Sequence, residues 1–242
     1  MKPVFFMQSI QFFLFFFATQ SAIAQETLVL STTAQPPYHT SEETGIIDRI
    51  LQEALERLNY KIKIFKLPAE RALIAANSGL SDGDPFRVAG LENKYPNLIS
   101  VPESLFSIEF VAFANRVDFP TISWNSLNPY SIGIITGWKI FENNLSNAAQ
   151  ITKVEDKTQL FNILIKNRVD VILYSKLPGL NHIRTQKIRG VKLLQPPIKK
   201  KKMFLYLHKK HRHLIPKIAD SLRAMKVDGV YQRIVKLSPQ IE

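Results

Sequence analysis

The chain has 242 residues, contains no cysteine and carries a formal net charge of +12. Without cysteine, a disulfide scaffold and a thiolate metal site are excluded, so packing alone must stabilise the fold. A basic protein can bind nucleic acid, but no aromatic side chains are interleaved with the basic runs at the spacing that nucleic-acid binding needs. We therefore interpret the basic runs at 199–202 and 209–213 as a solvated face, attracted at most weakly to an anionic membrane. No nucleic-acid partner is expected.

The first 24 residues predict an export signal. Lys2 gives a short positive region, 12–18 is an apolar run rich in phenylalanine, and Ala22-Ile23-Ala24 has the pattern of a cleavage site. Polar residues interrupt the apolar stretch, which is short for the about 20 residues of a membrane helix, so a membrane anchor is the weaker interpretation. Cleavage after Ala24 would leave 218 residues with a net charge of +11 in a periplasmic protein. That length is enough for one large or two small cores.

The first half of the mature chain alternates strands and helices. Apolar residues recur at helical spacing over 46–58, whereas they alternate with polar residues over 61–67. The expected elements are a strand at 27–33, a helix at 46–58, a strand at 61–67, a helix from Ala69 to Asn77-Ser78-Gly79, a short strand at Asp82 and a strand at 106–114. This order predicts a parallel sheet covered by helices.

The second half repeats the same alternation of strands and helices. The expected elements are a strand at 130–135 with a helix after it, a strand at 151–154, a helix at 157–166, strands at 169–174 and 203–207, and helices at 214–225 and 229–235. Two consecutive α/β units predict two lobes, with 118–128 as the crossing between them. The last strand and helices need a sheet to join, so we expect lobe 1 to hold 25–115 plus 203–242 and lobe 2 to hold 116–202.

Short motifs along the chain have a characteristic order and spacing. They are Pro36-Pro37-Tyr38, Gly45, Gly79 with Asp82-Gly83, Tyr95-Pro96-Asn97, Gly137, Arg168-Val169-Asp170, and Met225-Lys226 with Asp228-Gly229. In this arrangement the mature chain resembles the periplasmic solute-binding proteins of family 3, and most closely the short members without an adjacent transporter. The resemblance implies the α/β fold of type 2 periplasmic binding proteins. Its two lobes, each a mostly parallel sheet flanked by helices, are joined by two hinge crossings and close over a ligand.

Candidate ligand residues of the first lobe lie where strands end, since ligands of open α/β sheets gather there. Tyr38 would either stack on a solute or pack over the Pro-Pro turn. Arg87 follows the acidic corner Asp82-Gly83-Asp84, where its planar guanidinium would either bind a carboxylate or pair with Asp82 or Asp84. The resemblance implies the carboxylate role, although the Ser/Thr-rich run usual in the family is absent before Arg87. Arg71 is a second basic candidate, with a surface helix charge as its alternative.

Candidates of the second lobe are Thr136, Gly137, Trp138 and Tyr174. The first three form a turn where free backbone N–H groups and a helix start would favour an anion. Trp138 would either stack on the ligand or pack between the lobes. The resemblance places Tyr174 where members that bind α-amino acids carry an aspartate for the ammonium group, which argues against an ordinary α-amino acid. Asp170 is expected to orient the turn before its strand.

No catalytic constellation emerges from the sequence. The HExxH and GxSxG patterns are absent, and no carboxylates flank His211 and His213, so neither an enzyme nor a cofactor or metal is expected. We expect a monomer that captures a small polar solute, an amino acid or related carboxylate, for an inner-membrane ABC permease. The alternatives are a sensory protein that presents its closed state to a membrane receptor, and a small periplasmic lyase or hydrolase on the same fold.

Overall fold

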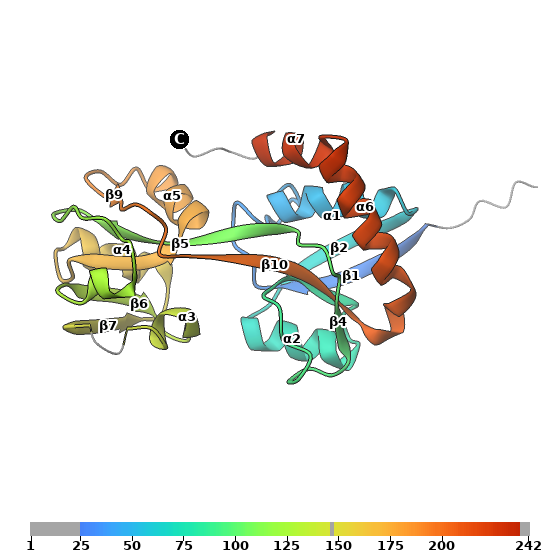
Figure 1. Ribbon diagram of the computed structural model, residues 1–242, viewed down its shortest axis with the longest axis horizontal. Helices are drawn as coiled ribbons and strands as arrows, with labels where there is room; N and C mark the ends of the chain where they lie inside the picture. The colour runs from blue at the N-terminus through green and yellow to red at the C-terminus, as the bar shows by residue number, and fades with distance from the viewer. Residues whose placement is uncertain (1–24, 146–147, 238–242) are drawn as a thin grey trace, which may run out of the picture.

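The structure, a computed structural model, describes residues 25–145 and 148–237, so the predicted export signal lies outside the described residues. Two α/β lobes lie side by side and are joined by two long strands (Figure 1). Within the described ranges, no helix is both long enough and apolar enough to cross a membrane. The two-lobed α/β architecture is the one that the sequence predicts.

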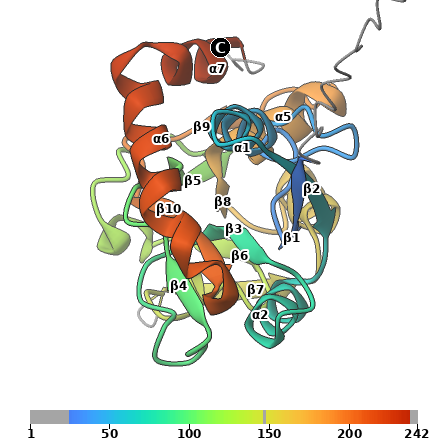
Figure 2. The ribbon, with the colours of Figure 1, turned by 90° about the vertical axis from the view of Figure 1, so that its right-hand side faces the viewer.

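The first lobe contains most of the amino-terminal half and the carboxyl-terminal helices. Its elements are β1 (Glu26–Thr32), α1 (Ile46–Glu56), β2 (Tyr60–Lys66), α2 (Ala69–Ser78), β3 (Gly83–Arg87), β4 (Leu98–Ser100), α6 (Ile215–Val227) and α7 (Val230–Leu237). The strands of this lobe and β10 (Lys199–His208) form a sheet of order β2-β1-β3-β10, and β4 also pairs with β10. Strand β1 is parallel to β2 and β3, whereas β10 is antiparallel to β3. Helices α1, α6 and α7 lie on one side of this sheet and α2 on the other (Figure 2).

The second lobe repeats the α/β pattern with a smaller sheet. Its elements are β5 (Phe106–Ala114), β6 (Ser131–Ile135), α3 (Lys139–Glu142), β7 (Gln150–Val154), α4 (Lys157–Ile165), β8 (Val171–Ser175), α5 (Lys176–Thr185) and β9 (Lys192–Leu193). The sheet order is β5-β8-β6-β7, with β9 paired to β5. Strand β6 is parallel to β7 and β8, and β5 is antiparallel to β8.

Strands β5 and β10 connect the lobes. They pair antiparallel from Phe106 opposite Met203 to Phe110 opposite Lys199, and β5 then continues along β8 while β10 continues along β3. The chain therefore passes between the lobes within β5, earlier than the predicted crossing at 118–128, because one uninterrupted strand serves both sheets. The division into 25–115 plus 203–242 and 116–202 stays a prediction, and these pairings favour boundaries inside the two strands.

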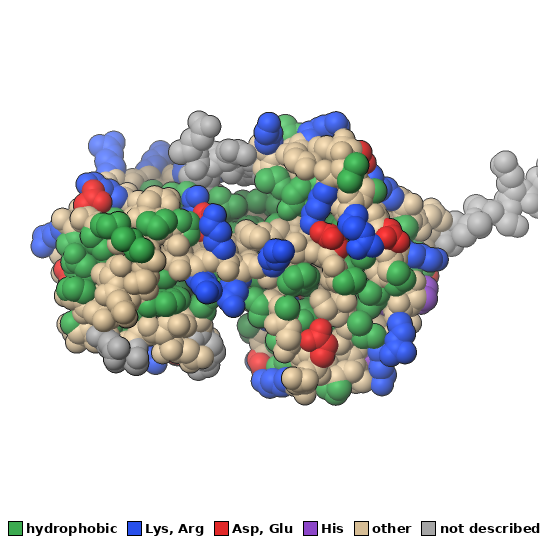
Figure 3. Space-filling view, in the orientation of Figure 1, with side chains coloured by type: hydrophobic (Ala, Val, Ile, Leu, Met, Phe, Trp, Pro, Cys, Tyr) green, Lys and Arg blue, Asp and Glu red, His purple; other side chains and the backbone are tan. Residues whose placement is uncertain are grey.

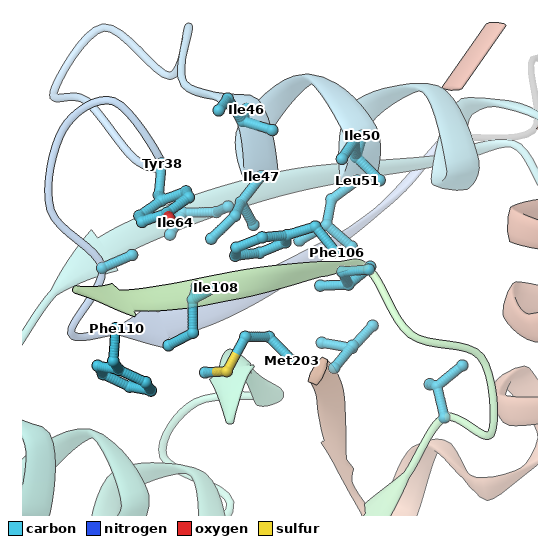
Figure 4. Close-up of a cluster of buried hydrophobic side chains, with 14 of the residues drawn as sticks. Tyr38, Ile46, Ile47, Ile50, Leu51, Ile64, Phe106, Ile108, Phe110 and Met203 are labelled. Atoms are coloured by element: carbon cyan, nitrogen blue, oxygen red, sulfur yellow. The ribbon is translucent and has the colours of Figure 1, made fainter. Parts of the chain in front are cut away.

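Helix α1 shows how the sequence positions one side of the interlobe space. Its apolar face is buried against the sheet and near the rings of Tyr38 and Phe106 (Figure 4). The buried Asp48 carboxylate fixes the start of the helix by accepting hydrogen bonds from the N–H groups of Gly45 (2.8 Å) and Thr40 (3.1 Å). A Cβ at Gly45 would lie 2.3 Å from the carbonyl oxygen of Tyr38. Only glycine therefore allows the approach that seats Tyr38 over the sheet.

Asp170 holds the turn into β8, as expected from its position before that strand. Its Oδ2 accepts hydrogen bonds from the Ser131 N–H (2.9 Å) and hydroxyl (2.6 Å), which lower the pKa of Asp170. Because ionised Asp170 is the better acceptor, we expect Asp170→Asn to lower the free energy of unfolding by about 1–2 kcal/mol at pH 7.

The difference should vanish as the pH falls below the usual aspartate pKa of about 3.9 and through the lowered folded pKa, because the carboxylate is then protonated. Urea unfolding of both proteins across this pH range measures the difference. Asp118→Asn, which removes an exposed carboxylate 3.2 Å from Lys192, is the matched control and should change stability by about 0.5 kcal/mol or less. Equal effects of the two substitutions would contradict the role of Asp170.

Candidate functional site

A cavity of about 560 Å³ lies between the lobes and is lined by residues of both. The molecular surface is hollowed between α2 and α3, with lysine and arginine side chains above the opening (Figure 3). Tyr38, Phe86 and Arg87 line the cavity from the first lobe, and Trp138 and Tyr174 line it from the second. The structure therefore brings together in one space five of the seven residues predicted from the sequence, namely Tyr38, Arg87, Gly137, Trp138 and Tyr174, whereas Phe86 was not predicted.

Arg87, the last residue of β3, is held by the protein itself. Its Nε lies 2.7 Å from Asp84 Oδ2, and its Nη2 lies 2.7 Å from both that oxygen and the carbonyl oxygen of Ala69. The Asp84 side chain is fully buried, and its other oxygen accepts the Phe86 N–H at 3.0 Å. The predicted alternative in which Arg87 pairs with Asp84 is therefore present in the structure. The two N–H groups of Nη1 bond to no described residue, and Arg87 lines the cavity.

Tyr38 combines packing with a place in the cavity wall. Its ring stacks on Phe106 at 4.9 Å and leans on Phe86 at 5.4 Å, and 2% of the residue is exposed. Burial, together with the charge of Glu109, raises the pKa of the Tyr38 hydroxyl. Tyr38 keeps its proton at neutral pH, as an ordinary tyrosine does, and the residue lines the cavity.

The second lobe supplies a stacked aromatic wall. Trp138 lies parallel to Tyr174 at 4.9 Å and to Phe141 at 5.5 Å, and the edge of Phe110 completes the cluster. Burial raises the pKa of Tyr174 to about 12, so this hydroxyl is also a neutral donor. Trp138 thus packs against Tyr174 and Phe141 of its own lobe and also lines the cavity.

The turn at Thr136-Gly137-Trp138 does not offer free backbone N–H groups, so that expectation is wrong. The N–H of Thr136 donates to Val154 O (2.8 Å), that of Gly137 to Glu142 Oε1 (3.2 Å), and that of Trp138 to Ile135 O (3.2 Å). The helix that follows, α3, is a single turn of four residues. Gly137 has φ +83° and still lines the cavity through its backbone. The turn shapes the wall but does not form an anion site.

Two predicted residues lie apart from the cavity. Arg71 is exposed on α2, and Thr136 is exposed with its hydroxyl donating to Val154 O at 3.1 Å; neither is among the lining residues. The Arg71 side chain leaves the site because Ala72, Leu73, Ala75 and Ala76 form the buried face of α2. Arg71 is therefore a charge on the helix surface, which was the alternative interpretation.

A pair of lysines at the cavity was not predicted from the sequence. Lys157 begins α4 in the second lobe and lines the cavity, and Lys66 ends β2 in the first lobe and donates to the lining residue Gln35 at 3.1 Å. The pKa of Lys66 is lowered by burial and, to a lesser extent, by the positive charge of Lys157 of the other lobe. Only the fold brings them together, because they lie far apart in the sequence.

The described lining of the cavity is mostly apolar. No group of three or more histidine, aspartate or glutamate side chains in the described ranges is arranged to hold a metal ion. The acidic lining residues Glu155 and Asp156 are exposed, and Asp156 caps α4 by accepting the Gln159 N–H at 2.9 Å. The remaining wall consists of aromatic faces, aliphatic side chains and polar groups that can donate or accept hydrogen bonds, such as Gln35 and Ser175. Such a wall holds and orients a solute.

We compared the sequence with protein-family models and with known proteins. No protein-family model matches the chain. In sequence it is similar to an uncharacterised protein of Shewanella oneidensis, 26% identical over 226 residues that cover 89% of this chain and 83% of that protein.

Similar solved structures have the same two-lobed fold. The GluR0 ligand-binding core in complex with L-glutamate has a TM-score of 0.74, 12% identity and coverage of 89% of this chain and 99% of that one. A histidine kinase sensor domain similar to periplasmic binding proteins has a TM-score of 0.73, 14% identity and coverage of 89% and 97%. An ancestral arginine-binding protein bound to glutamine has a TM-score of 0.69, 18% identity and coverage of 88% and 97%. The chain therefore has the type 2 periplasmic binding fold, and the predicted fold class is confirmed.

Proposed function

We propose that this chain is an exported solute-binding protein that captures a small polar solute, an amino acid or related carboxylate, for ABC-type uptake. The observation that carries the proposal is the 560 Å³ cavity walled by both lobes, because a ligand in it contacts both and stabilises their closed arrangement. The size suits one small molecule. The fold it shares with an arginine-binding protein and with a glutamate-binding receptor core supports the proposal.

The proposed ligand site has one jaw in each lobe. Tyr38 and Arg87 form the first jaw, and Gly137, Trp138 and Tyr174 form the second. Arg87 offers the N–H groups of Nη1 to a carboxylate, and the aromatic rings cover the rest of the solute. Arg71 and Thr136 are left out of this proposal because they do not line the cavity.

The cellular setting follows from the same function. The protein acts in the periplasm as a monomer after removal of the export signal behind Ala24, and it delivers its ligand to an inner-membrane permease. It does no chemistry on the solute and needs no cofactor. Closure bends or twists the β5–β10 connection, since these are the strands shared by the two sheets.

A thermal-shift screen of the mature protein against amino acids, organic acids, short peptides and polyamines tests the proposal. A ligand at a hundred times its Kd stabilises the folded state by about 2.7 kcal/mol. For a chain of this size the melting temperature should rise by roughly 5–10 °C. The fluorescence of Trp138 should change with the same ligand, because it lies in the cavity wall. A complete library without any shift would count against solute capture.

A sensory role is the second candidate, because the fold is shared with a histidine kinase sensor domain. In that case the closed protein presents itself to a membrane receptor, and deleting its gene would abolish a ligand-dependent response while uptake of the labelled solute continues. An enzymatic role on this fold would be recognised by conversion of the solute. NMR of the compound released from the protein should show it unchanged if the protein only binds it.

A further inference from the structure

Aromatic side chains form both walls of the cavity. Phe86 and Tyr38 line it from the first lobe, and Trp138, Tyr174 and Phe110 line it from the second. Each wall is braced from behind by further rings, since Phe106 stacks under Phe86 and Phe141 stacks under Trp138. Aliphatic side chains from the crossing strands complete the space between the walls. A flat aromatic or aliphatic body fits these walls, whereas a strongly hydrated one would be desolvated against them.

Three lining residues carry polar hydrogens that bond to no described residue. Tyr38 and Tyr174 are 2% and 3% exposed, both line the cavity, and neither hydroxyl bonds to a described residue. Both hydroxyls are protonated at neutral pH, as an ordinary tyrosine with a pKa of about 10 is, and burial raises their pKa further. Arg87 adds the unused N–H groups of Nη1. An anionic group of a ligand would accept hydrogen bonds from Arg87 and from both hydroxyls. An ammonium group, itself only a donor, could donate to the hydroxyl oxygens but would leave the N–H groups of Arg87 unpaired.

The charges around the cavity also favour an anion. Lys157 lines the cavity from the second lobe, and Lys66 of the first lobe donates to the lining residue Gln35, so an anion between the lobes would offset two positive charges. The buried carboxylate of Asp84 is taken up by Arg87 and the Phe86 N–H. Glu155 and Asp156, the acidic side chains of the described lining, are exposed at the start of α4 beside Lys157. An ammonium group in the enclosed part would therefore meet no carboxylate of the described lining there.

From these three observations we infer that the site selects an organic carboxylate with an aromatic or apolar body and without an α-ammonium group. The inference rests on the proposed function and narrows its ligand class. The carboxylate lies against Arg87 and the tyrosine hydroxyls, and the body lies between Phe86 and Trp138.

Matched pairs of probes test the ligand class, because the members of each pair differ by the α-ammonium group alone. Isothermal titration should give at least tenfold tighter binding of 3-phenylpropionate than of L-phenylalanine, and of indole-3-propionate than of L-tryptophan. Equal or tighter binding of the amino acids would overturn the inference. Binding of L-arginine, L-glutamine or L-glutamate alone would overturn it and leave solute capture standing. If no probe and no library compound binds, solute capture itself fails, and the inference fails with it.

Two variants locate the binding of 3-phenylpropionate. Lys157→Glu should weaken it at least tenfold, whereas Lys166→Glu, the same charge change at the exposed far end of α4, should leave it within twofold. Tyr174→Phe keeps the stacked ring and removes the hydroxyl donor, so binding should weaken about five- to tenfold. Melting temperatures of the ligand-free variants show whether each protein is folded. Unchanged affinity in folded Lys157→Glu and Tyr174→Phe would place the carboxylate elsewhere and overturn the inference.

Discussion

Replacing Arg87 with alanine is expected to lower the free energy of unfolding by about 3–5 kcal/mol, even in the absence of ligand. The Asp84 side chain is fully buried, and that of Arg87 is 11% exposed, so the substitution leaves a buried carboxylate without its cation. The melting temperature should fall by about 10 °C or more. Because a neutral carboxyl tolerates burial better than a charged one, the deficit should shrink as the pH is lowered from about 7 towards about 5.

The matched control is Arg71→Ala, which removes the same charge from the exposed face of α2 and should change stability by about 0.5 kcal/mol or less. The double variant Arg87→Ala/Asp84→Ala removes both partners and should recover part of the loss. Urea unfolding of the four proteins gives the comparison. An unchanged melting temperature in Arg87→Ala would mean that water reaches Asp84 and that the guanidinium serves the ligand alone.

Gly83→Ala is expected to be the second large effect, with a loss of about 3 kcal/mol, at the upper end of the usual range for overpacking. A Cβ at this position would lie 2.2 Å from the carbonyl oxygen of Tyr206 and 2.9 Å from the side chain of Leu207. The clash is with the backbone of β10, which also pairs with β5, so it cannot be relieved by a rotamer change. The substitution should therefore separate β3 from β10 and disturb Arg87 at the end of β3.

Gly190→Ala is the control for Gly83→Ala. Gly190 has φ +79°, but no atom lies within 4 Å of the position that a Cβ would take there. Alanine at this position therefore carries only backbone strain of about 1–2 kcal/mol. Circular dichroism during urea unfolding measures both variants. Similar losses at the two glycines would show that close approach to β10 is unimportant at Gly83.

Much of the fold is predictable because local patterns and tertiary structure agree. The strand predicted at 106–114 is β5, since the apolar run ends where Asn115 and Arg116 begin the next loop. The helix predicted at 46–58 is α1, which ends two residues earlier, because its apolar spacing matches the buried face. In both segments the side chains that define the pattern are also those that are buried.

Other elements were missed because the local signal opposes the tertiary structure. Helix α5 contains Pro178 and Gly179, which read as helix breakers, but Pro178 lies in the first turn, where its missing N–H is harmless. Gly179 is required by packing, since a Cβ there would lie 2.5 Å from the ring of Phe113. The strand predicted from Met203 begins at Lys199, because pairing with β5 extends it through four lysines.

The candidate site was predicted in part for the same reason. Side chains next to strand ends, such as Tyr38 and Arg87, are visible from strand order alone. The electrostatic effect of Lys157 on Lys66 cannot be predicted from strand order, because it depends on how the two lobes are oriented. The bonding of the Gly137 N–H to Glu142 also escapes the sequence, since it depends on where the single turn of α3 places that carboxylate.

The four lysines of β10 have a consequence for the protein in solution. Where β5 and β10 cross between the lobes they pair with each other, and no further strand among the described residues pairs with 106–109 or with 199–203 on the outer side. Such open strand edges are templates for pairing with another copy of the chain, and charged side chains, lysine above all, prevent it. All four lysines are exposed there. The lysines at 199–202 thus protect the paired segment of β5 and β10 from edge-to-edge aggregation.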